Sequence, residues 1–298
     1  MSEIIKTTNL TKRFPLVCAV NNVNLTINQG DIVGLVGKNG SGKTTLIKLL
    51  SNVAIPSGGK VERFGLHNPC DLSAIIERPA LYEKLTAYQN VQARCKLLNI
   101  PFDKEYADKT LNLLGIDPEN KTKVGNFSLG MRQRTAIALA LLGKPKMLLL
   151  DEPINGLDPE GIKEVRDILK NLSLNGVTIL ISSHILSELA KIATRYVFMD
   201  KGRIVAQMTE EEVEAINCAR LRLTTKQADK AFSVFKEMGV DARIVSENVL
   251  ELYTDMSLTA IIKLMMEHEV DVKTVARANG TLEDFYLRLV KKGGGDNV

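Results

Sequence analysis

The sequence predicts an α/β protein with a parallel sheet, followed by a smaller α+β domain. The first observation is a strand–helix–strand unit, in which apolar runs at 146–150 and 177–182 flank a helix at 159–174. Such a unit places its two strands in one parallel sheet. The second is the apolar run at 31–36, which enters a glycine-rich turn and is typical of a buried strand. The third is a change of pattern after about residue 217, where shorter elements alternate.

In chain order, the first elements are strands with one polar face. Alternation of apolar and polar residues at 4–10 and 23–27 predicts two of them. The buried strand at 31–36 follows, and the glycine-rich turn leads into a helix at 44–50. Two adjacent glycines within 57–60 predict a turn.

The middle of the chain is mostly helical. A helical pattern of apolar residues extends over 85–142, and Pro101, Gly115 and Pro118 interrupt it. After the strand–helix–strand unit, apolar runs at 196–199 and 203–206 are separated by Asp-Lys-Gly, which predicts a hairpin.

The remainder of the chain predicts a β-α-β-β-α-β order of the ferredoxin-like kind. Its elements are expected at 221–223, 226–238, 242–245, 249–253, 258–268 and 270–275. A last helix is expected at 281–290, with one broad apolar face. Packing on the core is the expected role of that face, and a partner groove is the alternative.

Composition excludes several classes of function. The 298 residues carry 39 Lys and Arg against 35 Asp and Glu, a net charge of +4, which is too small to indicate nucleic acid as a partner. The four cysteines are scattered, so neither a zinc site nor a disulfide framework is expected, as is usual in a reducing cytoplasm. Residues 1–6 lack the order of a secretory signal. The longest apolar run, 136–142, is far shorter than the roughly 18 residues that span a bilayer. Any transport role therefore requires a separate membrane subunit.

Residues 37–44 (GKNGSGKT) fit the phosphate-loop pattern G-x-x-x-x-G-K-[ST]. The glycines allow backbone N–H groups to converge on phosphate oxygens, and the following helix adds its positive end. Lys43 is expected to reach the β- and γ-phosphates of ATP, and the Thr44 hydroxyl to bind Mg²⁺. The expected nucleotide-binding residues of this segment are Gly37, Asn39, Gly40, Ser41, Gly42, Lys43, Thr44 and Thr45.

Two acidic residues end the apolar run that follows Lys146. Asp151 is expected at the carboxyl end of a buried strand, beside the phosphate loop, where it holds Mg²⁺ through water. Glu152 is expected to act as the general base toward the attacking water. The alternative for an Asp-Glu pair after a strand is an ordinary solvated loop, which the phosphate loop disfavours.

Residues 127–134 (FSLGMRQR) place a Ser-x-Gly element at the start of a helix, and Ser128 lies 23 residues before Asp151. This arrangement resembles the signature sequence of ATP-binding-cassette (ABC) proteins, and the resemblance covers residues 3–215. It implies a P-loop NTPase of ABC type, with a RecA-like parallel sheet core, an antiparallel β subdomain and a helical subdomain at about 78–135. The expected division is an ABC ATPase domain over 1–216 and an α+β accessory domain over 217–298.

The resemblance also implies a head-to-tail homodimer in the ATP-bound state. Ser128 and Gly130 occupy the signature positions that touch the γ-phosphate of the second subunit's ATP, and a helix start with a free N–H and a hydroxyl is an anion site. Leu129 replaces the usual glycine and Met131 the usual glutamine. Both changes leave Ser128 and Gly130 intact.

Three further positions correspond to functional positions of the family. Two of them carry the family's usual residue, and the third carries a different one. Asp158, in residues 155–158 (NGLD), matches the D-loop near the interface, and His184 matches the switch histidine that contacts the γ-phosphate; the alternative for a lone histidine is a structural role. Glu77 stands where the family has a metal-binding glutamine, so a carboxylate serves Mg²⁺ there unless Glu77 is a plain loop acid.

Phe14 matches the adenine-stacking aromatic, which can be worth about 1–3 kcal/mol. A core phenylalanine is the alternative.

Glu77, the Ser-Leu-Gly-Met signature and the α+β tail together resemble the ATPases of bacitracin-resistance and lantibiotic-immunity exporters. That resemblance implies an ATP-hydrolysing subunit on the inner face of the cell membrane. It would drive separately encoded permease subunits, gripped by the helical region, that export an antimicrobial peptide or drug. Two alternatives stay open. One is a nutrient importer, although importers carry glutamine at the Glu77 position. The other is a non-transport ABC ATPase acting on DNA or ribosomes, although those usually have long coiled coils or two cassettes.

Overall fold

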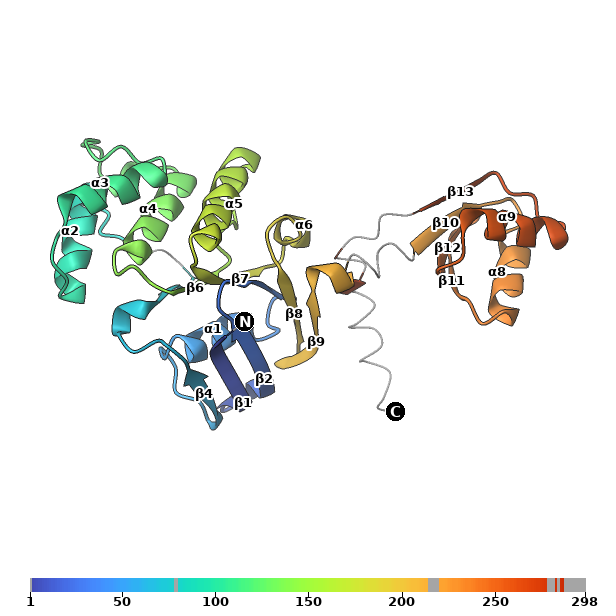
Figure 1. Ribbon diagram of the computed structural model, residues 1–298, viewed down its shortest axis with the longest axis horizontal. Coiled ribbons are helices and arrows are strands. Elements are labelled where there is room, and N and C mark those ends of the chain that lie inside the picture. The colour runs from blue at the N-terminus through green and yellow to red at the C-terminus, as the bar shows by residue number, and fades with distance from the viewer. Residues whose placement is uncertain (1, 78–79, 214–219, 278–281, 283–284, 287–298) are drawn as a thin grey trace. The chain divides into compact units, whose positions relative to one another are not determined.

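The computed structural model describes residues 2–77, 80–213, 220–277, 282, 285 and 286. The chain divides into two compact units between Met208 and Thr209, called here the N-terminal and C-terminal units (Figure 1). The boundary expected at 216/217 lies outside the described residues.

A six-stranded sheet forms the centre of the N-terminal unit, in the order β5-β6-β7-β3-β8-β9. Neighbours from β5 to β8 pair in parallel. The strands are β3 (Ile32–Val36), β5 (Leu72–Ile75), β6 (Met147–Asp151), β7 (Thr178–Ser183), β8 (Arg195–Asp200) and β9 (Arg203–Thr209). Every residue of β3, β6 and β7 is buried, as expected for parallel strands covered on both faces. The predicted hairpin is confirmed, because β8 and β9 are neighbours joined by two residues with positive φ, Lys201 and Gly202.

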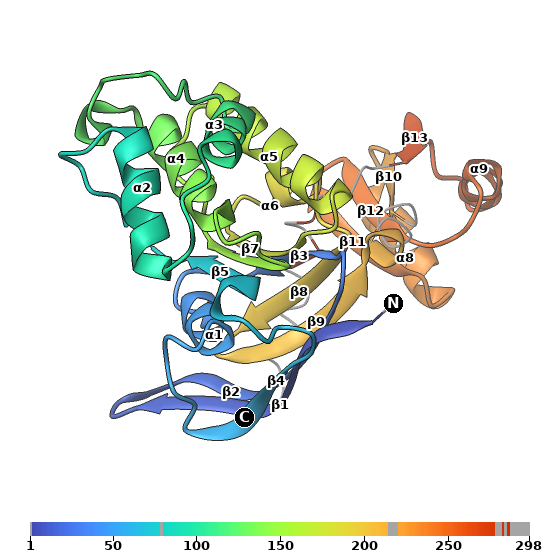
Figure 2. The ribbon, with the colours of Figure 1, turned by 60° about the vertical axis from the view of Figure 1, so that its left-hand side comes forward.

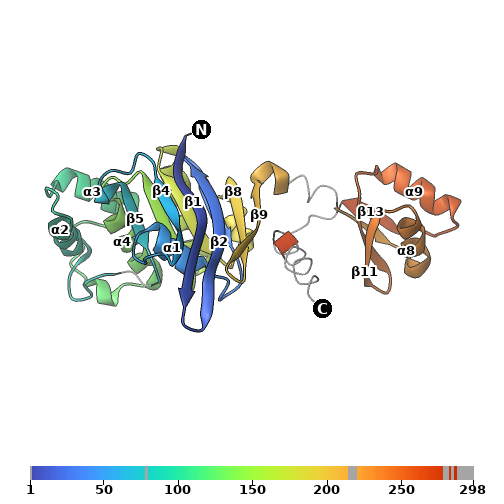
Figure 3. The same cartoon turned by 90° about the horizontal axis from the view of Figure 1, so that it is seen from below.

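A second, antiparallel sheet has the order β2-β1-β4. Its strands are β1 (Glu3–Phe14), β2 (Val17–Asn28) and β4 (Gly58–Arg63), and the first two form a long ribbon (Figure 3). The turn predicted at 57–60 is wrong, because Gly58 begins β4. Gly59 has φ +73°, and a Cβ there would lie 2.3 Å from the carbonyl oxygen of Asn9. Glycine is therefore present because the backbones of β4 and β1 approach closely, and not because the chain reverses.

Helices cover both faces of the parallel sheet (Figure 2). On one side, α1 (Lys43–Leu50) packs between β6 and the antiparallel sheet, while on the other α4 (Leu129–Leu141) contacts β5 and α5 (Pro159–Leu174) contacts β7. The predicted helical region also holds α2 (Ala87–Leu98) and α3 (Lys104–Leu113), and a short α6 (Leu186–Leu189) follows β7. Two single turns of 3-10 helix occur at Pro69–Asp71 and Val124–Asn126.

Among its described residues, the C-terminal unit contains an antiparallel sheet and the helices α8 and α9. Its elements are β10 (Arg220–Thr224), α8 (Ala228–Glu237), β11 (Asp241–Ser246), β12 (Val249–Tyr253), α9 (Leu258–Glu267) and β13 (Thr274–Arg277). The sheet order β11-β12-β10-β13, with every pair antiparallel, confirms the predicted ferredoxin-like arrangement.

The last strand begins later than the predicted 270–275. Glu269 adopts φ +54° and the N–H of Val270 donates to the carbonyl of Met265 at 2.8 Å, so the first of those residues close helix α9. Most of the helix expected at 281–290 lies outside the described residues. Within the described ranges, none of the helices has the length and apolarity that a bilayer crossing requires.

Candidate active site

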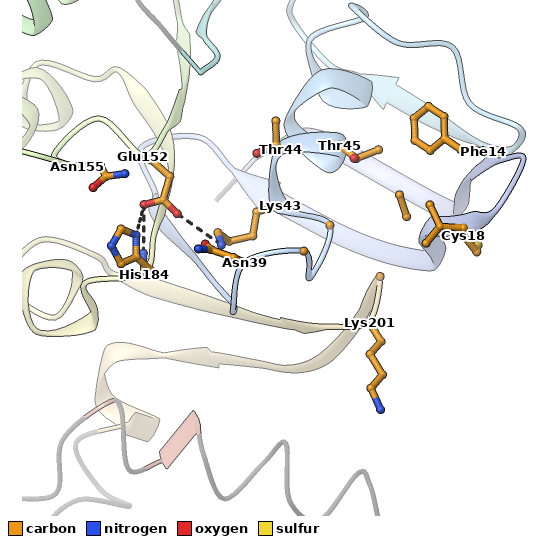
Figure 4. Close-up of a pocket in the computed structure, with 15 residues that line it drawn as sticks. Phe14, Cys18, Asn39, Lys43, Thr44, Thr45, Glu152, Asn155, His184 and Lys201 are labelled. Atoms are coloured by element: carbon orange, nitrogen blue, oxygen red, sulfur yellow. Dashed lines mark hydrogen bonds and ion pairs between the residues drawn. The ribbon is translucent and has the colours of Figure 1, made fainter.

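A pocket of about 760 Å³ opens beside the start of α1 (Figure 4). Nine residues that the sequence indicated line it: Phe14, Asn39, Gly40, Gly42, Lys43, Thr44, Thr45, Glu152 and His184. Five others were not predicted as site residues, namely Val17, Cys18, Ala19, Lys201 and Gly202, and a sixth, Asn155, belongs to the motif at 155–158. Residues from β1, β2, α1 and the ends of β6, β7 and β8 thus meet here, at the carboxyl edge of the parallel sheet, where such sheets bind ligands.

The loop between β3 and α1 is shaped by its glycines. Gly42 has φ +106°, and a Cβ there would lie 2.3 Å from the carbonyl of Ala19. A Cβ on Gly37 would lie 2.3 Å from the Ser41 hydroxyl oxygen. That Ser41 oxygen is buried and has no hydrogen-bond partner in the described part of the chain. A bare backbone turn with an unpartnered buried hydroxyl before a helix start fits a phosphate group.

Lys43 lines the pocket, and two contacts fix the position of its ammonium group. Its side chain is only 6% exposed, and Nζ donates to the carbonyl of Gly37 at 2.7 Å. The same Nζ lies 3.5 Å from Oε1 of Glu152. A buried cation between a carbonyl and a carboxylate is held in place for an incoming anion.

Asp151 is buried at the end of β6, and two hydroxyl groups bind its carboxylate. Thr44 Oγ1 donates to Oδ2 at 2.8 Å, and Ser182 Oγ donates to Oδ1 at 2.7 Å. Ser182 also accepts the backbone N–H of Glu152 at 2.9 Å. Ser182 was not predicted as a site residue. The available signal was a polar residue in an otherwise apolar buried strand, since such a residue needs a partner.

Glu152 and His184 form the second contact at this edge. His184 Nδ1 lies 2.6 Å from Oε2 of Glu152, and the His184 backbone N–H donates to the same oxygen at 3.3 Å (Figure 4). With Glu152 ionised, the proton lies on Nδ1. Glu152 has φ +51°, a conformation that non-glycine residues rarely adopt and that costs on the order of 1–3 kcal/mol.

The far end of the pocket is apolar. Phe14 is 47% exposed, so the alternative of a core phenylalanine is wrong. Lys12 Nζ lies 5.3 Å from the centre of the Phe14 ring. In Figure 4 the ring and Glu152 lie at opposite ends of the pocket. An exposed aromatic ring at this end suits stacking by a planar group whose phosphates extend to Lys43, on the face that Lys12 does not cover.

A second pocket, of about 510 Å³, lies at the start of α4 and is called here the signature pocket. Ser128 is the N-cap of α4, and its Oγ accepts the N–H of Met131 at 3.2 Å. Gly130 leaves the helix start open, since a Cβ there would be 3.8 Å from its nearest neighbour, Leu157. Asp158 also lines this pocket and caps α5 through the N–H of Gly161. The two pockets share no lining residue.

Arg134 links three elements beneath the signature pocket. Its Nη1 donates to the carbonyl of Leu114 at 3.2 Å and lies 3.4 Å from a carboxylate oxygen of Glu164 on α5. A Cβ on Gly115 would lie 2.6 Å from that same nitrogen. Arg134 was not predicted as a functional residue.

Glu77 is not among the residues that line the first pocket, beside the start of α1, which is called here the nucleotide pocket. Its carboxylate pairs with Lys48 Nζ at 2.7 Å, and this contact lowers the pKa of the Glu77 carboxyl from its ordinary value. Thr44 and Asp151 are brought together as expected, and Glu77 is not joined to them. Among the described residues, no group of three or more His, Cys, Asp or Glu side chains could hold a metal ion. The Thr44 hydroxyl and the Asp151 carboxylate suit Mg²⁺, which takes one or two protein ligands and completes its shell with phosphates and water.

A phosphate loop that lies beside an Asp-Glu pair, at the carboxyl edge of one parallel sheet, defines a P-loop nucleotide-binding ATPase. The ABC transporter family model matches residues 20–155. A bacitracin transport ATP-binding protein of Bacillus licheniformis is 35% identical over 99% of both chains. The chain therefore belongs to the ABC transporter family, and it is an ATP-binding, ATP-hydrolysing subunit of that family.

Two further comparisons agree. A lantibiotic transport ATP-binding protein of Streptococcus pyogenes is 38% identical over 68% of this chain and 90% of its own length. A nucleotide-free ATP-binding cassette from an ABC transporter, solved by crystallography, superposes with a TM-score of 0.64 and 27% identity. The match covers 72% of this chain and 94% of that chain. The predicted fold class, a P-loop NTPase of ABC type with a small α+β domain, is confirmed.

Proposed function

We propose that this subunit works as an ATP-dependent, head-to-tail homodimer beneath separately encoded membrane permease subunits. One observation carries the proposal: the nucleotide pocket and the signature pocket share no lining residue. Each chain therefore has a phosphate loop without a capping helix start, and a helix start without a phosphate loop. A two-fold axis that faces each pocket with the other chain's complementary pocket completes two sites at once.

The roles proposed for the side chains follow from their positions. The ammonium of Lys43 binds the β- and γ-phosphates, and Phe14 stacks on the adenine. Thr44 and Asp151 would hold Mg²⁺, with Glu77 as a further candidate, and the ion supplies charge neutralisation of the phosphates. Glu152 accepts the proton of the attacking water, while His184 orients the Glu152 carboxylate and contacts the γ-phosphate. Ser128, Gly130 and Asp158 meet the partner's nucleotide.

The cargo proposed is an antimicrobial peptide that leaves the cell. The relatives named for bacitracin transport and lantibiotic transport support this choice. The subunit would then lie on the inner face of the cell membrane, attached through its permease. The helical region that holds α2 and α3 is the proposed grip on the permease.

Mixing two inactive variants tests the shared site. Lys43→Ala disables the phosphate loop, and Gly130→Asp places a carboxylate in the signature pocket where there is room for a side chain. Each variant alone is expected to be inactive. In an equimolar mixture half of the dimers carry one intact composite site, so ATPase activity should recover to roughly a quarter of the wild-type rate.

The control is a mixture of Lys43→Ala with the double variant Lys43→Ala/Gly130→Asp, which offers no intact composite site and should stay inactive. If the first mixture also stayed inactive although both variants folded, the shared-site dimer would be ruled out.

A further inference from the structure

Strand β11 of the C-terminal unit is an open sheet edge. Among the described strands it pairs only with β12. Ile244 is 37% exposed and Val245 is 49% exposed, although both are apolar. Edge strands are usually protected by lysine, proline, a bulge or a covering segment, because their free N–H and C=O groups pair readily with another strand. The sequence DARIVS of β11 contains neither lysine nor proline, and the register irregularity in its pairing with β12 lies near the end of the strand, between Ile244 and Ser246.

Two exposed charges on this strand have no partner in the described part of the chain. The side chains of Asp241 and Arg243 form no hydrogen bond or ion pair there. Two residues apart on a strand, they lie on the same face of the sheet. Glu251, which faces Arg243 across the strand pair, is already bound by Arg222 at 2.8 Å. Arg243 therefore offers its charge outward.

Asp241 and Arg243 lie symmetrically on either side of Ala242, so two copies of this strand that run in opposite directions can pair opposite charges. In an antiparallel pair of two β11 strands with the two-fold axis at Ala242, Asp241 of each copy faces Arg243 of the other, twice. The same register brings Val240 opposite Ile244, and Val240 and Ala242 already belong to the apolar core of this unit. A register centred on Arg243 places two guanidinium groups opposite each other, so charge selects the first register.

We propose that β11 pairs with β11 of a second copy of this chain and joins two four-stranded sheets into one. The contact needs no nucleotide, because it involves only the C-terminal unit. It is thus separate from the ATP-dependent contact between the nucleotide and signature pockets. A second copy is the occupant because opposite charges placed symmetrically about Ala242 fit the same sequence running in reverse.

Sedimentation velocity of the full-length protein without nucleotide tests this proposal. The wild-type protein is expected to form a dimer. Asp241→Arg and Arg243→Asp should each raise the dimer Kd by about tenfold or more, since each places like charges opposite one another. The exchanged variant Asp241→Arg/Arg243→Asp restores opposite charges in the same register, so its Kd should return to within about threefold of wild type.

Asp255→Arg is the matched control, since it makes the same charge change at an exposed position outside the strand and should leave the Kd unchanged. Thermal unfolding of each variant separates a loss of pairing from a loss of folding. A wild-type protein that stays monomeric without nucleotide would overturn the proposal, and so would an exchanged variant as weak as the single ones. Adding ATP to Asp241→Arg/Glu152→Gln reports the ATP-dependent contact alone.

Discussion

The nucleotide pocket and the signature pocket differ in how their charges are arranged. In and directly beside the first, a buried ammonium, the carboxylates of Asp151 and Glu152 and an imidazole are held by contacts between 2.6 and 3.5 Å. In the second, the acidic side chains of Asp158, Glu160 and Glu164 outnumber the one cation, Arg134. The donors to an anion there are the helix start, the Ser128 hydroxyl and the guanidinium of Arg134, which already binds Leu114 and Glu164.

The difference shows that the two pockets suit different tasks. The first is organised to bind a triphosphate within one chain. The second is poorly suited to hold a free anion, because its carboxylates repel one, and it suits a phosphate that another chain already holds. Substitutions in the first pocket should therefore change ATP binding by the monomer or the chemistry of the assembled site, whereas those around the second should act only when two chains meet.

The largest effect is expected from Glu152→Gln, which removes the proposed base and keeps its shape. Turnover should fall by about 10²–10⁴, while ATP binding to the monomer stays within twofold of wild type. ATPase assays and nucleotide titration check this. Wild-type turnover would show that Glu152 is not the base.

A smaller effect is expected from Phe14→Ala. Loss of stacking worth about 1–3 kcal/mol should weaken ATP binding by at least fivefold, with kcat little changed. Equilibrium titration of the monomer with ATP measures the change. Leu16→Ala, at a side chain that is 99% exposed, is the matched control. Unchanged ATP affinity in Phe14→Ala would remove Phe14 from the nucleotide site.

The smallest effect is expected from Arg134→Gln, which breaks the link between α4 and α5. Partly exposed ion pairs contribute about 1 kcal/mol or less, so turnover at low protein concentration should fall about two- to fivefold. ATP affinity of the monomer should not change. Glu164→Gln and the double variant complete the cycle, and independent effects of the two substitutions would contradict the proposed link.

Helices and buried strands were predictable because their signals are local. Helix α5 begins and ends where predicted, since Asp158 caps it, Pro159 opens it and Gly176 follows it. The phosphate loop and the Asp-Glu pair were found because each lies within a few consecutive residues. Strand β4 was missed because its glycines, which normally indicate a turn, are required by the neighbouring strand.

The remaining features depend on residues far apart in the sequence. Ser182 on β7 binds Asp151 on the neighbouring strand β6, although 31 residues separate them in the sequence. Glu77 pairs with Lys48, which lies on helix α1. Arg134 gains its importance from Leu114 and Glu164, which no spacing rule connects to it. A pattern within one segment identifies which groups are present, but the fold decides which partner each one meets.

The backbone at Glu152 has a consequence for the stability of variants. Its φ of +51° suits glycine, which adopts positive φ without a steric penalty. Glu152→Gly thus relieves local strain while it deletes the carboxylate. The same change leaves the buried ammonium of Lys43 without this partner. A relaxed backbone and an intact set of charges therefore impose opposite demands on position 152.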